Sequence, residues 1–324
     1  MKSGKILIIG ACGQLGTELT NALRDRFGKN VVASDRYPIS NQFELYQQLD
    51  VLNYKAVEDL VKREKITQVY LLAAMLSASS EKNAESAWEL NMQGLLNVLK
   101  IAHLLKLDKV FWPSSIAVFG SGVPKRDCPQ NTIIEPKTIY GISKRSGELW
   151  CNYYFEKHGV DVRSLRYPGL ISYKTAPGGG TTDYAIDIFH QALEKKIFTC
   201  FLKQDTCLPM MYMPDAVRAT IELMDAPKEK ISIRTSYNLA SFSFTPNELR
   251  QAIQKRIPQF QVEYMPDFRQ HIADGWPGSI NDVVAQNDWG WKSEYSMDQM
   301  VEDMLEKLLE KNNLTNKKLF TNHL

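Results

Sequence analysis

The sequence predicts an α/β protein of the Rossmann type, with a doubly wound parallel sheet and a smaller C-terminal lobe that binds the substrate. Three observations predict this fold. Short apolar runs alternate with segments of helical spacing in the first half of the chain, a glycine-rich turn follows the first apolar run, and the pattern becomes irregular after residue 168. We expect a dinucleotide-binding domain over 1–168. We expect a mainly substrate-binding lobe over 169–324, with some segments returning to the main domain.

The first half of the chain alternates between predicted strands and helices. Residues 5–9 form a continuous apolar run, which is typical of a strand buried in a parallel sheet. Apolar residues at helical spacing over 14–27 predict the helix that follows. The same patterns predict strands over 31–34, 68–72, 109–113 and 162–166 and helices over 56–63, 84–105 and 139–157. Right-handed crossovers then bring the carboxyl ends of all strands to one edge of the sheet, where ligands bind.

Glycine and proline interrupt this alternation beyond residue 168. The interruptions are Pro168-Gly169, the glycine-rich segment 177–180 and Pro209. Helical spacing returns over 183–195, 215–224, 246–256 and 297–309, and short strands lie between these segments. The mixture predicts a smaller lobe, which ends in a solvated and mildly basic tail over 311–318.

Composition excludes several classes of function. The net charge is +2, with 39 Lys and Arg against 37 Asp and Glu, which gives no electrostatic case for nucleic acid or membrane partners. The five cysteines are scattered and form no CxxC pair, and there is no HExxH motif. We therefore expect a reducing compartment and no metal site. The chain also has no apolar run of the roughly 18 residues that a membrane helix needs.

The first predicted strand begins at Lys5, which leaves no room for a signal or transit peptide. We therefore expect a cytoplasmic protein, and the mitochondrial matrix also fits if a leader has been removed.

The glycine-rich turn predicts a dinucleotide site. Gly10, Gly13 and Gly16 form a GxxGxxG pattern between a strand and a helix. The first glycine permits the tight turn, the second lets the backbone approach a pyrophosphate, and the third lets helix and strand pack closely. Together with the intervening Gln14 and Leu15, they would place the phosphates at the N-terminus of the helix, where free N–H groups favour an anion.

Residues at the ends of the next strands indicate which dinucleotide binds. Asp35 ends the second strand, where a carboxylate binds the ribose hydroxyls and repels a 2′-phosphate, so the sequence favours NAD over NADP. Arg36 could accommodate such a phosphate and keeps NADP as the alternative. Asp50 and Val51 fit an adenine contact or a plain strand-end loop. The third strand ends in Leu72, Ala73 and Ala74. The small side chains there would let the backbone lie against the cofactor, or they would serve only in packing.

A serine, a tyrosine and a lysine predict proton transfer beside the cofactor. Ser115 follows a predicted strand, and Tyr140 and Lys144 lie one turn apart on a predicted helix. A free tyrosine has a pKa of about 10, so it needs help to act as a base. The ammonium of Lys144 and a cationic nicotinamide would both favour the phenolate. Ser115 would then hold the substrate oxygen in line, and Ser77 could also face the substrate.

These residues resemble motifs of the extended short-chain dehydrogenase/reductase superfamily. The run 114–120 (SSIAVFG) is similar to its SSxxVYG motif, and 140–144 (YGISK) is similar to its YxxSK motif. Residues 282–291 resemble its C-terminal signature. The resemblance implies that Asn91 completes a catalytic set with Ser115, Tyr140 and Lys144 through a proton relay.

Four further segments narrow the resemblance to the short-chain-type L-threonine 3-dehydrogenases; they are 165–172, 177–185, 208–215 and 275–277. This resemblance implies NAD-dependent oxidation of L-threonine to L-2-amino-3-ketobutyrate. It also implies functional coupling to 2-amino-3-ketobutyrate CoA ligase, which cleaves that product to glycine and acetyl-CoA. A homodimer joined by the helices over 84–105 and 139–157 is implied as well.

The resemblance also implies the residues around the substrate and the nicotinamide. Ser77, Thr181, Thr182 and Trp276 match the substrate shell, while Tyr167 and Pro168 match the segment that flanks the nicotinamide. Plainer roles stay open at this point. The two threonines would also suit the cap of the helix that starts near 183, and the tryptophan would suit the core.

Two other functions remain as alternatives. A nucleotide-sugar epimerase or dehydratase on the same scaffold would use the same serine, tyrosine and lysine. A non-catalytic, redox-sensing NAD(P)-binding protein would keep the glycine loop, but such proteins usually lose the tyrosine and lysine pair, which is intact here as Tyr140 and Lys144.

Overall fold

The computed structural model describes residues 4–38, 42–176, 178–194 and 197–321. Its centre is a parallel sheet of seven strands in the order β10-β6-β5-β4-β1-β2-β3. The strands are β1 (Lys5–Ile9), β2 (Val31–Asp35), β3 (Tyr46–Gln48), β4 (Ile66–Leu71), β5 (Lys109–Ser115), β6 (Val162–Tyr167) and β10 (Tyr237–Asn238). The order reverses beside β1, so the sheet is doubly wound and the predicted fold class is confirmed.

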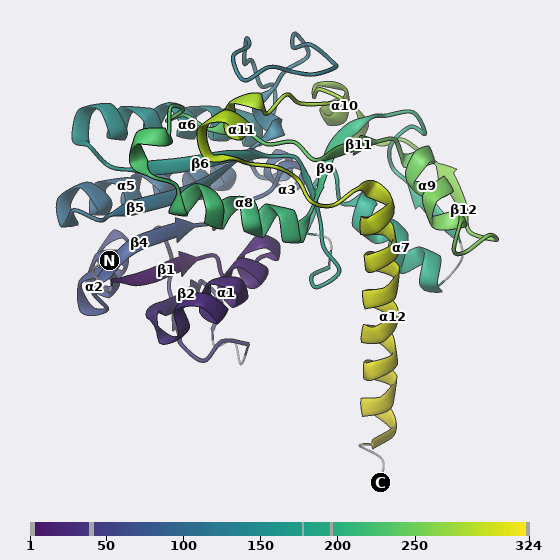
Figure 1. Cartoon of the computed structure of the whole chain (residues 1–324), viewed down its shortest axis with the longest axis horizontal. Helices are drawn as coiled ribbons and strands as arrows, with labels where there is room; N and C mark the ends of the chain where they lie inside the picture. The colour runs from purple at the N-terminus through teal and green to yellow at the C-terminus, as the bar shows by residue number, and fades with distance from the viewer. Residues whose placement is uncertain (1–3, 39–41, 177, 195–196, 322–324) are drawn as a thin grey trace.

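Helices cover both faces of this sheet (Figure 1). On one face lie α1 (Gln14–Phe27), α8 (Met213–Asp225) and α11 (Val283–Trp289), which share one apolar core with the sheet. On the other face lie α2 (Tyr54–Arg63), α5 (Gly94–Leu105) and α6 (Ile139–His158), which share a second core. Apolar side chains on both faces explain why these strands read as continuous apolar runs in the sequence.

The predicted helix over 84–105 is not continuous. It consists of α4 (Ala84–Trp88), a single π turn η2 (Glu89–Gln93) and α5, and a short helix α3 (Ser77–Lys82) precedes it. A π turn adds a residue to the helical repeat and is frequently found at functional sites. This turn contains Asn91, the residue for which the sequence implied a catalytic role.

The lobe lies beside the sheet (Figure 1). Its apolar side chains form a third core, to which residues 116–119 of the main domain also belong. The lobe contains a three-stranded sheet of β7 (Gly169–Ile171), β9 (Leu208–Tyr212) and β11 (Phe242–Phe244), and a pair of β8 (Ile197–Cys200) with β12 (Gln261–Tyr264). Its helices are α7 (Tyr184–Glu194), α9 (Pro246–Gln254), α10 (Arg269–Asp274) and α12 (Met297–Thr321). Short 3-10 turns lie at η1 (Gly28–Asn30), η3 (Ile116–Val118) and η4 (Lys228–Lys230).

Some boundaries differ from those that the sequence predicts. The short strand β3 and the helix α3 were not predicted, because neither is long enough to show a period. Helix α12 runs to Thr321 instead of ending near 309, so the segment expected as a tail is helical. Pro177, the first residue of the segment 177–185, and Lys195, the last residue of the predicted helix 183–195, lie outside the described residues. The division at residue 168 stays a prediction, although α8, β10 and α11 from the second half pack on the main sheet.

Within the described part of the chain, no helix is long and apolar enough to span a membrane.

Candidate active site

Two cavities meet at the carboxyl edge of the main sheet. The first, of about 240 Å³, is lined by Tyr140, Lys144 and the glycine loop, and we call it the tyrosine cavity. The second, of about 600 Å³, is lined by Asp35, Asp50 and the other side of the same loop, and we call it the aspartate cavity. Five residues line both cavities: Gly10, Gly13, Leu72, Ala74 and Leu76. The two hollows therefore form one crevice, divided by the loop that follows β1.

Every site residue predicted from the sequence, except Asn91, lines one of these cavities. The aspartate cavity contains the residues expected around the adenosine, which are Asp35, Arg36, Asp50, Val51 and Ala73. The tyrosine cavity contains those expected around the phosphates, nicotinamide and substrate, which are Gln14, Leu15, Gly16, Ser77, Ser115, Tyr140, Lys144, Tyr167, Pro168, Thr181, Thr182 and Trp276.

The glycine loop has the form that a pyrophosphate requires. Gly10 has a φ of +92°, which disfavours other residues, and a Cβ there would lie 2.5 Å from the backbone nitrogen of Ala73. A Cβ on Gly16 would lie 2.1 Å from the carbonyl oxygen of Gly10, so only glycine lets α1 start this close to the loop. The Nε2 atom of Gln14 is buried and has no hydrogen-bond partner among the described residues. A buried donor without a partner is costly, and an anionic ligand in this cavity would satisfy it.

Asp35 is fixed beside the glycine loop. Its carboxylate accepts hydrogen bonds from the backbone nitrogen of Cys12 at 3.1 Å and from that of Arg36 at 2.8 Å. The guanidinium of Arg36 donates to the hydroxyl of Tyr37 at 3.1 Å and lies over its ring. The acid thus lies between β2 and the loop, where a ribose would meet it, and the arginine lines the same cavity from the exposed side.

Asp50 and Val51 form the wall of the aspartate cavity behind this point. The Asp50 carboxylate accepts the backbone N–H of Leu52 at 2.9 Å, and Val51 is buried. Asn97 on α5 donates to the carbonyl of Val51 at 2.9 Å and fixes that backbone. The end of β4 closes the crevice, because the backbone nitrogens of Leu72 and Ala73 both donate to the carbonyl of Ile9.

Tyr140 and Lys144 lie buried side by side at the start of α6. The Lys144 Nζ atom is 5.5 Å from the centre of the Tyr140 ring and donates a hydrogen bond of 2.6 Å to the carbonyl of Pro113. Lys144 also lies 4.5 Å from the centre of the Trp112 ring, where a cation is favoured. The carboxyl end of β5 therefore presents Pro113 to the lysine and Ser115 to the tyrosine.

Burial works against charge on both groups. It raises the pKa of the Tyr140 phenol to about 12, although a hydrogen bond with Ser115 acts in the opposite direction. It also lowers the pKa of the Lys144 ammonium to about 7, although Cys151 and Glu148 favour the charged form. Desolvation therefore outweighs the neighbouring charge in the protein alone, and the joint effect of Lys144 and a cationic nicotinamide on the pKa of the phenol stays a prediction. A further positive charge in the cavity would favour the phenolate.

Hydroxyl groups from the main domain and the lobe meet across the tyrosine cavity. The Ser77 Oγ atom lies 3.1 Å from the Thr181 Oγ1 atom and accepts the backbone N–H of Thr181 at 3.2 Å. The carboxylate of Asp183 accepts the backbone N–H groups of Gly179 and Gly180, both at 2.8 Å. Asp183 thus shapes the turn before α7, and the side chains of Thr181 and Thr182 line the cavity.

Trp276 and Tyr167 close the cavity from two sides. Trp276 is buried, and its carbonyl accepts a hydrogen bond of 2.9 Å from Lys125, so the indole is both packed and part of the cavity wall. The Tyr167 hydroxyl is paired with Thr220 on α8, and Pro168 follows it at the end of β6. The Tyr167 side chain is therefore anchored on α8.

Asn91 lies outside both cavities. Its side chain accepts the backbone N–H of Met75 at 2.8 Å and donates to the Met75 carbonyl and the Ser143 hydroxyl, both at 3.2 Å. These contacts join the π turn to the end of β4 and to the residue before Lys144. The proton relay through Asn91 stays a prediction.

Several other residues line the tyrosine cavity that the sequence analysis did not assign to the site, although some lie in the segments it named. They are Leu76, Pro113, Ser114, Ile116, Gly169, Leu170, Gly180 and Asp183. Pro113 and Ser114 could have been found, because they end a predicted strand directly before Ser115. Asp183 and Leu76 could not, because their places depend on how the lobe meets the sheet.

No group of three or more His, Cys, Asp or Glu side chains that could hold a metal ion occurs among the residues that the structure places.

Comparisons with known proteins agree with this geometry. The model of the NAD dependent epimerase/dehydratase family matches residues 6–240. The mitochondrial L-threonine 3-dehydrogenase of Bos taurus is 46% identical over 310 residues, which are 93% of this chain and 82% of the bovine protein.

Two solved structures are similar over nearly their whole length. A GalE-like L-threonine dehydrogenase from Cupriavidus necator in its holo form is 57% identical, with a TM-score of 0.92 over 94% of this chain and 99% of the other. A monomeric L-threonine 3-dehydrogenase from a metagenome, in its apo form, is 47% identical, with a TM-score of 0.92 over 95% of this chain and 99% of the other.

The close approach of Gly16 to the Gly10 carbonyl leaves no room for a side chain in the glycine loop. Gly16→Ala should weaken dinucleotide binding by about 10-fold or more, because the new methyl group would displace the Gly10 carbonyl and with it the loop. Gly122→Ala is the matched control, since no atom lies within 4 Å of the Cβ it would add. Binding is measured by titrating NAD into each variant. Equal affinities of the two variants would show that the loop does not hold the cofactor.

Proposed function

This chain belongs to the NAD-dependent epimerase/dehydratase family, and we propose that it is an NAD-dependent L-threonine 3-dehydrogenase. The observation that carries the proposal is the tyrosine cavity. Tyr140 and Lys144 line this cavity together with the paired hydroxyls of Ser77 and Thr181. The first pair suits the oxidation of an alcohol, and the hydroxyls suit the binding of a small polar substrate. The relatives named as L-threonine dehydrogenases support the choice of alcohol.

The crevice fits NAD. Asp35 would hold the adenosine ribose, the loop from Gly10 to Gly16 would hold the phosphates, and Tyr167 and Pro168 would flank the nicotinamide. When bound, NAD supplies a hydride acceptor and a positive charge. The positive charge matters here, because burial otherwise keeps the Tyr140 phenol protonated.

The residues of the chain then carry out the proton transfer. Ser115 orients the substrate hydroxyl. The Tyr140 oxygen takes the proton of this hydroxyl as hydride leaves the carbon that bears it. Lys144 stabilises the phenolate from its place on the carbonyl of Pro113. In its protonated form it would also hold the nicotinamide ribose. The products are the 3-keto acid, NADH and a proton that is passed to solvent.

Neutral hydroxyls would hold the carboxylate of threonine. Ser77, Thr181 and Thr182 each offer an O–H donor on the cavity wall, and Trp276 limits the length of the substrate. A nucleotide-sugar epimerase would have to bind a second nucleotide beside the cofactor, whereas the hydroxyls of this cavity suit a small amino acid.

A redox sensor would not need a catalytic pair, so the buried Tyr140 and Lys144 favour an enzyme.

We propose two further features of the biological context. The product is a β-keto acid, which decarboxylates readily, so coupling to a 2-amino-3-ketobutyrate CoA ligase would protect it. The enzyme would act in the cytoplasm, or in the mitochondrial matrix if a leader was removed; the bovine relative is named as mitochondrial.

The direct test is the formation of NADH from L-threonine, followed by absorbance with a chelator present. We expect NADH with L-threonine, much less with L-allo-threonine, and no conversion of UDP-sugars. Tyr140→Phe should lower turnover by about 1000-fold or more and leave NAD affinity within about 2-fold, because only the proton acceptor is removed. Tyr264→Phe is the control, since this tyrosine lies in β12, outside both cavities. Conversion of a UDP-sugar without NADH formation would instead assign the chain to the epimerases.

We also propose that the protein is a homodimer joined through α4, α5 and α6. The outer surface of these helices carries exposed apolar side chains, which are Trp88, Leu104, Ile142, Leu149, Trp150 and Tyr153. Trp150 and Tyr153 pack edge to face, with ring centres 5.6 Å apart. Scattered exposed apolar residues are normal, but a cluster on neighbouring helices is typical of an interface.

Leu149→Glu should therefore convert a dimer into a monomer, because it would place charges within the apolar interface. The mass in solution is measured by sedimentation. Ile133→Glu is the control, since Ile133 is 69% exposed and lies on a loop before α6. A wild-type protein that is already monomeric, like the metagenomic relative, would contradict the proposal.

A further inference from the structure

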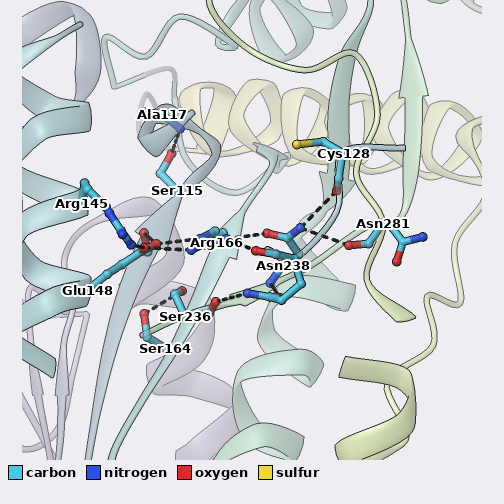
Figure 2. Close-up of polar contacts among 12 residues, drawn as sticks. Ser115, Ala117, Cys128, Arg145, Glu148, Ser164, Arg166, Ser236, Asn238 and Asn281 are labelled. Atoms are coloured by element: carbon cyan, nitrogen blue, oxygen red, sulfur yellow. Dashed lines mark hydrogen bonds and ion pairs between the residues drawn. The ribbon is translucent and has the colours of Figure 1, made fainter. Parts of the chain in front are cut away.

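A fully buried carboxylate lies one turn beyond Lys144 on α6 (Figure 2). The Oε1 atom of Glu148 accepts hydrogen bonds from the Arg166 Nε and from the Ser114 hydroxyl, both at 2.7 Å. Its Oε2 atom accepts from the Arg166 Nη2 at 2.9 Å and from the Arg145 Nη1 at 3.1 Å. Four donors therefore satisfy one buried charge, which is the condition under which such a charge is tolerated.

The arginine of this pair is fixed from its other side. Its Nη1 atom donates to the Asn238 Oδ1 at 3.0 Å and to the Gln130 carbonyl at 3.2 Å. The Asn238 amide in turn donates to the carbonyls of Cys128 and Asn281 at 3.2 and 3.1 Å. Figure 2 shows the row of contacts from Arg145 through Glu148 and Arg166 to Asn281. The carboxylate is therefore held directly by β5, α6 and β6, and Arg166 links it to Gln130, Asn238 and Asn281.

Ser114 connects this network to the catalytic residues. It lies between Pro113, whose carbonyl binds Lys144 at 2.6 Å, and Ser115. Helix α6 and strand β5 are thus joined at two successive points. Lys144 holds the carbonyl of Pro113, and Glu148, one helical turn further, holds the hydroxyl of Ser114.

We propose that Glu148 is a positioning residue for the reaction. Through Ser114 it holds the carboxyl end of β5 against α6, so that Ser115 and the Pro113 carbonyl stay aligned with Tyr140 and Lys144. This inference rests on the proposed function, because that function assigns the roles of Ser115, Tyr140 and Lys144.

The negative charge of Glu148 also supports the proposed reaction, because it favours the protonated form of Lys144. Burial lowers the pKa of Lys144, while Cys151 and Glu148, on the same helix, raise it. From β5 the ring of Trp112 and the Pro113 carbonyl face the ammonium, and Tyr140 faces it from the first turn of α6. Without the charge of Glu148, Lys144 would lose its proton at a lower pH. The positive charges of Arg166 and Arg145 would then be uncompensated, and they would also lower the pKa of Lys144.

The first test separates the geometric link from the ion pair. Ser114→Ala removes only the contact between Glu148 and β5, and we expect kcat for L-threonine to fall about 10-fold, with the KM for NAD within about 2-fold. Ser164→Ala is the matched control, because this serine is about equally buried on the neighbouring strand β6 and, among the residues that the structure describes, its hydroxyl bonds only to Ser236, at 3.0 Å. We expect near wild-type kcat from the control. Equal kcat values in the two variants would overturn the inference.

The second test uses the charge. Glu148→Gln should move the alkaline limb of the kcat–pH profile to lower pH, since activity needs Lys144 protonated and its proton is then lost earlier. An unchanged profile in a folded variant would show that the charge plays no part. If this variant does not fold, Ser114→Ala decides the question alone. A wild-type protein that forms no NADH from L-threonine would overturn the proposed function instead, whatever the variants do.

Discussion

The buried ammonium of Lys144 is the constraint on which the arrangement of this site depends. A lysine that is 2% exposed can stay charged only if nearby groups replace the water it has lost. The Pro113 carbonyl, the Trp112 ring and the carboxylate of Glu148 do so from two elements, β5 and α6. Glu148 is itself buried, and its charge is balanced by the ion pair with Arg166. Arg166 is held in turn by Asn238, in the second half of the chain.

These contacts join the two halves of the sequence. Arg166 lies on β6 and finds its partner, Asn238, on β10, the strand that the second half of the chain adds to the main sheet. The same second half supplies Thr181 to the cavity, opposite Ser77. The elements that balance the buried charge thus also bring the substrate side of the crevice to the catalytic side.

The sequence predicted the main sheet well, because buried parallel strands and amphipathic helices leave long and regular patterns. Residues 5–9 and 14–27 match β1 and α1 at both ends. The glycines, Asp35, Ser115, Tyr140 and Lys144 could be placed in one crevice, since parallel strands end at one edge. The contact between Ser77 and Thr181, the π turn and the pairing of Glu148 with Arg166 could not. They depend on distances between segments far apart in sequence, which no local pattern encodes.

The most direct test of this account is the ionisation of Tyr140, followed by ultraviolet difference spectra between the wild type and Tyr140→Phe. Without NAD the phenol should stay protonated until strongly alkaline pH, because burial raises its pKa to about 12. With NAD bound, the tyrosinate signal should appear at clearly lower pH, since the cofactor adds a positive charge beside Lys144. The same ionisation pH with and without NAD would contradict the account, as would a phenolate at neutral pH in the cofactor-free protein.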